Sequence, residues 1–163
     1  MSPILEVLLI GVAATLAMTG VIAVLHGSTL NTADMIRALG SIFTQNQNFT
    51  FTAGMLAHTI MGCLSAFLYV AVWSTFDFTG VYQLMAVGAV IGLAQGLFIS
   101  FLLIVMVAEH HKLARFRNMG FGVAVAFLVA HIVYGAVVGW GAGKFGSRFA
   151  ALERWQIKTE SKL

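Results

Sequence analysis

The sequence predicts an all-α integral membrane protein, a four-helix up-down bundle with a short interfacial helix in its first loop. Hydrophobic residues make up 60% of the chain and charged residues only 9%, whereas soluble domains carry about 25% charged residues. Four apolar runs each reach the ~20 residues that a helix needs to span a bilayer. They are continuously apolar rather than alternating, which favours helices over a β-barrel. One bundle uses nearly the whole chain, so residues 1–163 are expected to form a single transmembrane domain.

The first apolar run covers residues 3–25. Glu6 is its only charged residue, and no basic segment precedes it. A secretory signal peptide begins with a basic segment and ends at a small-x-small cleavage site. Because neither feature is present, we expect this run to be retained as the first membrane span.

The first loop contains a segment, residues 32–43, that is typical of a short amphipathic helix. Apolar side chains recur at helical spacing on one face of it, from Met35 to Phe43. Asn31 or Thr32 can cap its first turn. We expect this helix to lie flat at the membrane surface.

The other spans are predicted at residues 52–75, 82–108 and 120–142. Four spans place both termini on one side of the membrane and the first and third loops on the other, which we call the loop face. Residues 144–163 form a basic tail, either another interfacial helix or a partly disordered segment. Four of the Lys and Arg residues fall on the loop face and five in the tail. By this small excess the positive-inside rule favours cytoplasmic termini.

The basic residues flank membrane spans instead of forming a separate charged surface. Cations in such positions set topology or contact anionic lipid headgroups. The expected partners are therefore the lipid bilayer and other membrane protein subunits, and nucleic acid is not expected.

Two short motifs suggest an internal repeat. Residues 57–62 read AHTIMG and residues 130–135 read AHIVYG. The preceding spans contain a weaker match, GVAATLAMT against GLAQGLFIS. These matches predict two repeated helical hairpins related by an axis along the membrane normal.

The histidines gather in one half of the predicted bundle. In this topology the loop-face half contains all five: His26, His58, His110, His111 and His131. His58 and His131 are expected inside spans, about 9 Å and 16 Å from the loop face. Ionisable residues at such depths usually face the bundle interior and mark functional sites. The alternative is that each ring is simply hydrogen-bonded to a neighbouring Thr, Gln or backbone carbonyl, and Thr15, Thr19 and Gln95 are available for this.

A glycine follows each of these two histidines by one helical turn. Gly62 and Gly135 clear space beside His58 and His131 that a flat ligand could occupy. Histidines on diagonal helices can hold a haem b from both sides, within an apolar shell. The competing interpretation is close helix packing of the small-xxx-small kind. It accounts for the glycine ridge at residues 88, 92 and 96, and at this stage both interpretations of Gly62 and Gly135 remain open.

A transition-metal site is a second use of the same residues. His58, His131, Glu109 and His110 could converge on zinc, copper or iron. A proton relay from His111 through His131 to Gln95 is a third use. The sequence offers no Ser-His-Asp set and no phosphate-binding glycine loop, so an enzyme is not expected.

Five segments carry a resemblance to a known family: GVAATLAMT, DMIRALG, HTIMG, EHH and HIVYG. Together they resemble the small bacterial inner-membrane proteins typified by YagU. The resemblance implies a four-span protein of the bacterial inner membrane, and it brings no catalytic residues with it. The segment EHHK departs from the family, where a proline is expected after the acidic residue and histidine.

These observations predict a non-enzymatic subunit of a larger membrane assembly, such as an electron-transfer complex. Its inner histidine pair would hold a haem or a metal. The alternatives are a structural accessory subunit without a ligand and a small transporter or proton conductor.

Overall fold

The computed structural model describes residues 2–26, 35–76, 78, 80–102 and 121–160, with side chains as far as residue 145. Every regular element in these residues is a helix. The helices are α1 (Pro3–His26), α2 (Met35–Phe43), α3 (Thr50–Trp73), α4 (Val81–Leu102) and α5 (Phe121–Glu160).

Four of these helices are long and apolar enough to span a bilayer. The candidate spans are Pro3–Leu25, Thr50–Trp73, Val81–Leu102 and Phe121–Phe145. The protein is therefore an all-α, multi-pass membrane protein, as predicted from its composition. The end predicted for the third span, residues 103–108, lies outside the described residues. The basic tail does not begin a new helix, because α5 continues without a break to Glu160.

The short helix of the first loop is confirmed as α2, although the expected residues 32–34 lie outside the described part. Small residues bring α2 against the start of α3. A Cβ added at Gly40 would meet the carbonyl oxygen of Thr50, and one added at Gly54 would meet that of Ile36. The docking of α2 therefore depends on a glycine in each helix.

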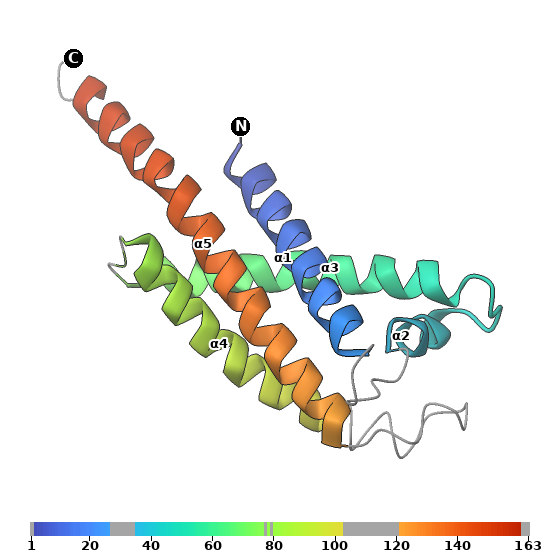
Figure 1. Ribbon diagram of the computed structural model, residues 1–163. Helices are drawn as coiled ribbons and strands as arrows, with labels where there is room; N and C mark the ends of the chain where they lie inside the picture. The colour runs from blue at the N-terminus through green and yellow to red at the C-terminus, as the bar shows by residue number, and fades with distance from the viewer. Residues whose placement is uncertain (1, 27–34, 77, 79, 103–120, 161–163) are drawn as a thin grey trace.

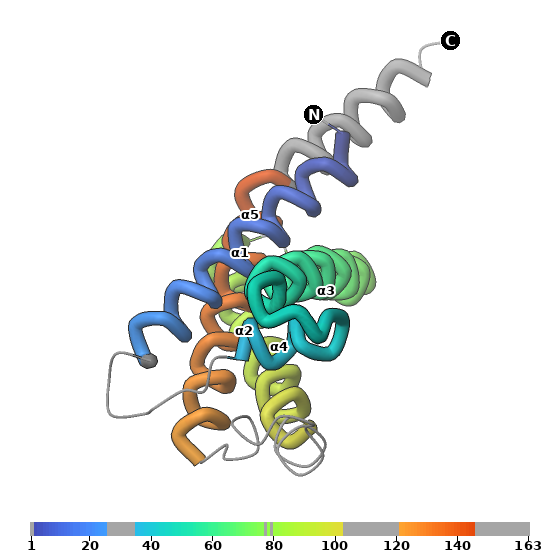
Figure 2. Tube along the Cα trace, turned by 90° about the vertical axis from the view of Figure 1, so that its right-hand side faces the viewer, coloured from blue at the N-terminus to red at the C-terminus, as the bar shows by residue number. Residues whose placement is uncertain are grey.

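The four long helices do not all run side by side. In Figure 1, α5 runs antiparallel to both α4 and α1, whereas α3 crosses the other three steeply. Figure 2, turned by 90°, shows α3 nearly end-on while α1, α4 and α5 run down the view. The two expected hairpins, α1–α3 and α4–α5, therefore have different crossing geometries. α3 packs mainly on α1 and α2, and α5 packs mainly on α4 and α1.

The contact between α4 and α5 is a glycine seam. A Cβ at Gly92 would meet the carbonyl oxygen of His131, and one at Gly139 would meet that of Leu84. Gly88 and Gly135 face each other in the same way, each against the other's carbonyl. These contacts confirm the packing interpretation of the glycine ridge on α4.

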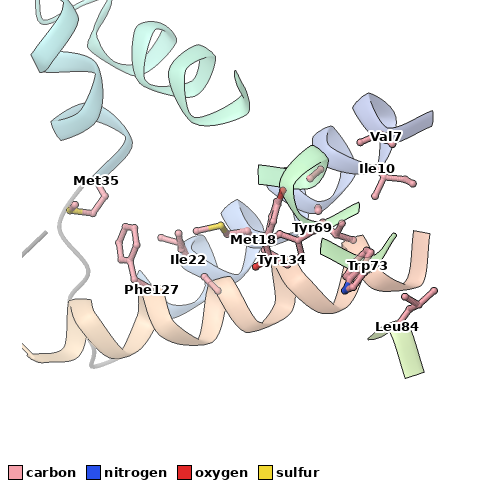
Figure 3. Close-up of a cluster of buried hydrophobic side chains, with 14 of the residues drawn as sticks. Val7, Ile10, Met18, Ile22, Met35, Tyr69, Trp73, Leu84, Phe127 and Tyr134 are labelled. Atoms are coloured by element: carbon pink, nitrogen blue, oxygen red, sulfur yellow. The ribbon is translucent and has the colours of Figure 1, made fainter. Parts of the chain in front are cut away.

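A buried cluster joins α1, α3 and α5 where they meet (Figure 3). At its centre the Tyr69 ring packs edge-on against Trp73 and against Tyr134, with ring centroids 5.7 Å apart in both pairs. Met18 and Ile10 of α1 complete this part of the cluster. Edge-to-face aromatic pairs of this kind add about 0.5–1.5 kcal/mol beyond their buried area. Some members of the cluster, from Met35 on α2 to Tyr134 on α5, also line the candidate site described below.

Candidate functional site

A cavity of about 570 Å³ lies between the helices, and all five contribute to its lining. Most of the lining side chains are apolar, and many are aliphatic or Met. A smaller group is polar: Thr15, Thr19, His58, Ser65, Gln95, His131 and Tyr134. An apolar cavity with a few convergent polar groups is the usual form of a small-molecule site.

His131 is held rigidly in this lining. Its side chain is only 6% exposed, and its Nδ1 lies 2.7 Å from the carbonyl oxygen of Phe127. A carbonyl oxygen only accepts, so Nδ1 must donate its hydrogen to it. In the neutral imidazole the other nitrogen, Nε2, then carries a lone pair that can accept a hydrogen bond or bind a metal.

His58 lies in the same lining, on α3. Its Nε2 is buried and has no hydrogen-bond partner among the described residues. Both imidazoles border the same cavity. The structure therefore brings together the two histidines that the repeated motif singled out.

The three side chains expected beside the histidines make hydrogen bonds to other groups. Thr15 donates to the carbonyl oxygen of Gly11 at 2.7 Å, and Thr19 donates to that of Thr15 at 2.8 Å. Gln95 accepts from the Tyr69 hydroxyl at 2.8 Å and donates to the Ser65 hydroxyl at 3.1 Å. His131 bonds to a backbone carbonyl of its own helix, which is one of the partners that the structural alternative predicts for the ring.

The two glycines of the motif face neighbouring helices. A Cβ at Gly62 would meet the hydroxyl oxygen of Thr15 on α1, and one at Gly135 would meet the carbonyl of Gly88 on α4. Gly62 also borders the cavity and accepts a hydrogen bond from the Tyr134 hydroxyl through its carbonyl. The space beside Gly135 is filled by α4, so Gly62 is the glycine of the pair that adjoins the cavity.

The other predicted metal ligands cannot be placed. Glu109 and His110, like His111, lie outside the described residues. His26 ends α1 and is not part of the cavity lining. Within the described helices, no group of three or more His, Cys, Asp or Glu side chains is close enough to hold a metal ion.

Two buried polar groups in another part of the chain were not anticipated. The Glu6 side chain is 5% exposed, and its Oε2 has no hydrogen-bond partner within the described part of the chain. The same is true of the indole Nε1 of Trp73. A lone acidic residue within an apolar span was the sequence signal for Glu6. Neither residue lines the cavity.

Comparison with protein-family models, with curated proteins and with solved structures gives no match to this chain.

Proposed function

We propose that this protein is a non-enzymatic membrane subunit that holds a ligand in its central cavity through His58 and His131. One observation carries the proposal: both imidazoles border one cavity, and a buried nitrogen of His58 lacks a hydrogen-bond partner among the described residues. Leaving such a group unpaired costs about 1–3 kcal/mol. A ligand that pairs with it recovers part of that free energy on binding.

The test is native mass spectrometry of the full chain, released gently from detergent. We expect a non-protein mass on the wild type and its loss from His58→Ala and His131→Ala. Thr59→Val is the matched control, because Thr59 neighbours His58 on α3 but bonds to the carbonyl of Met55, outside the cavity lining. A folded wild type that carries no ligand and binds none when lipid extract is added would contradict the proposal.

Haem b is the second candidate, and one observation favours it. A metal-ligating histidine usually donates its other ring nitrogen to a carbonyl or carboxylate, which is the arrangement of His131 with Phe127. His131 and His58 would be the axial ligands, and the haem would supply one-electron transfer to a larger membrane assembly. A visible spectrum with metal analysis decides this. A colourless, metal-free protein that still folds would eliminate haem and leave the organic ligand.

Location and orientation belong to the same proposal. We place the protein in a bacterial inner membrane with both termini in the cytoplasm, in keeping with the YagU-like motifs. The even number of candidate spans supports one part of this placement, that both termini lie on the same side of the membrane. Reporter fusions at the C-terminus measure the orientation: a cytoplasmic reporter should be active there and a periplasmic one inactive, and the reverse result would overturn it. Affinity purification in mild detergent tests for partner subunits.

A further inference from the structure

We infer that the ligand is a neutral amphiphile with a hydroxyl head, which enters the cavity head first from the bilayer. Its hydroxyl lies between His58 and His131, and its apolar chain extends toward α2. This inference rests on the proposed function and names the ligand class.

The polarity of the cavity changes along its length. On α4, Gln95 precedes the apolar Ile99 and Leu102, and on α1, Thr15 precedes the apolar Ile22. The polar lining of both helices is thus nearer the N-terminal end. In Figure 1 these two helices run in the same direction, so their polar residues lie at the same end of the cavity.

The other two long helices continue this gradient. α5 runs antiparallel to α4 (Figure 1), and its lining residues are Phe127, then His131, then Tyr134. Its polar residues therefore come last, at the same end as Gln95. Ser65 of α3 reaches that end as well, through its hydrogen bond from Gln95. The opposite end, next to α2, is lined by apolar side chains. A lipid lying in its usual orientation would meet the reverse order, so the head must point inward.

The head must also be neutral. Among the described residues that line the cavity, none is Asp, Glu, Lys or Arg. An ionised head would lose its hydration without gaining a counter-ion, which is costly in an apolar environment. Arg37 stands near the apolar end, above the ring of Phe51 at 5.6 Å, but is not part of the lining.

The hydrogen-bonding pattern selects a hydroxyl. His131 Nε2 can only accept, because Nδ1 holds the ring hydrogen for Phe127. The Nε2 of His58 has no partner among the described residues and is the second ring nitrogen available to a ligand. A hydroxyl donates to His131, and its oxygen can accept from His58 in the tautomer that carries the hydrogen on Nε2, whereas a ketone or quinone carbonyl cannot donate to His131.

The cavity opens toward lipid. Several of its lining residues are exposed, among them Met61 at 51% and Phe51 at 49%, which belong to the candidate span α3. In a bilayer, large apolar side chains on the outside of a span meet acyl chains. Such an opening admits a molecule already dissolved in the membrane. The cavity volume of about 570 Å³ falls within the ~300–1,000 Å³ common for small-molecule sites.

The test compares four probes on the full chain in lipid nanodiscs, each titrated and followed by native mass spectrometry. The probes are a decyl-substituted quinol kept reduced, its quinone, farnesol and laurate. We expect the quinol and farnesol to bind about tenfold more tightly than the quinone or laurate, because only the first two donate from a neutral hydroxyl. A preference for the quinol over farnesol identifies an aromatic diol head, and the reverse identifies a prenol.

Variants make the result specific to the two imidazoles. His131→Phe should remove the preference for quinol over quinone, while Thr59→Val should retain it. Tight binding of laurate that falls in Arg37→Gln would overturn the inference in favour of an anionic head at the α2 end. If none of the probes binds but a histidine-dependent ligand or haem co-purifies, the hydroxyl inference fails and the proposed function stands. If no ligand is found in either experiment, both fail.

Discussion

In both the α4–α5 seam and the cavity beside α3, glycines face a neighbouring helix, but the seam is closely packed and the other region encloses a cavity. In the seam, Gly88, Gly92 and Gly135 let two helix backbones touch, and no space is left between them. Beside α3, Gly62 also touches a neighbouring helix, at Thr15, yet it borders a cavity of about 570 Å³. A small residue one turn from a histidine therefore does not by itself determine whether the space beside it is filled.

The crossing geometry explains the difference. α4 and α5 lie side by side over much of their length (Figures 1 and 2), so small residues at four-residue spacing stay in register along the contact. α3 crosses the other long helices steeply, and two steeply crossing helices touch only over a short stretch. Away from that stretch the helices diverge. Here α2 and the histidines line the space that remains.

Breaking the seam should have the largest effect. Gly92→Leu places a side chain against the carbonyl of His131, where backbone and not a flexible side chain must move. We expect a loss of about 3 kcal/mol or more in unfolding free energy, at the upper end of overpacking costs. Denaturant unfolding in mixed micelles measures it. Gly20→Leu is the control, because a Cβ at Gly20 meets nothing within 4 Å. Equal destabilisation of both variants would contradict the claim that close packing at Gly92 stabilises the α4–α5 contact.

Displacing α2 should affect the cavity more than the fold. Gly54→Leu drives a side chain into the Ile36 carbonyl on α2, and we expect about 1–3 kcal/mol of destabilisation. The sharper readout is hydrogen exchange, which should become faster for α2 amides while the α4 and α5 amides keep their protection. Ligand binding should fall at the same time. Uniformly faster exchange in all helices would show that α2 is not a separable cover.

Removing a polar side chain from the cavity lining should lower the free energy of unfolding by less than the displacement of α2 does. Gln95→Leu leaves the Tyr69 hydroxyl without its acceptor and Ser65 without its donor. Hydrogen bonds within membrane proteins average about 0.6 kcal/mol and reach about 1.7, so we expect a loss in that range. Measurement is by the same unfolding assay. Gln83→Leu, in the first turn of the same helix and outside the cavity lining, is the control and should change stability less.

The smallest effect is expected from Tyr134→Phe. This change removes one hydrogen bond, to the carbonyl of Gly62, and keeps the ring that packs on Tyr69. We expect the free energy of unfolding to fall by about 0.6 kcal/mol, with the aromatic cluster intact. A loss as large as that of Gly92→Leu would mean that the hydroxyl, and not the ring, holds α3 against α5.

Much of the candidate site could be predicted from the chain. His58 and His131 stood out because an ionisable ring is costly in an apolar span and so must face the interior. Their four-residue relation to a glycine was equally visible. The roles of Ser65, Tyr69 and Gln95 as one hydrogen-bonded group could not be predicted, because they come from two helices whose contact depends on the crossing angle. The burial of Trp73 could not be predicted for the same reason.

The sequence by itself determined the class of the protein. Four apolar runs long enough to cross a bilayer can satisfy their backbone groups only as helices, and an amphipathic stretch between the first two predicted α2. The packing of the helices adds the rest. α3 crosses the other long helices, Gly135 is covered by α4 while Gly62 borders a cavity, and the two imidazoles share the lining of that cavity. The physical reason is that composition and spacing act along one helix, whereas a cavity forms between helices. Its existence depends on the angle at which their surfaces meet.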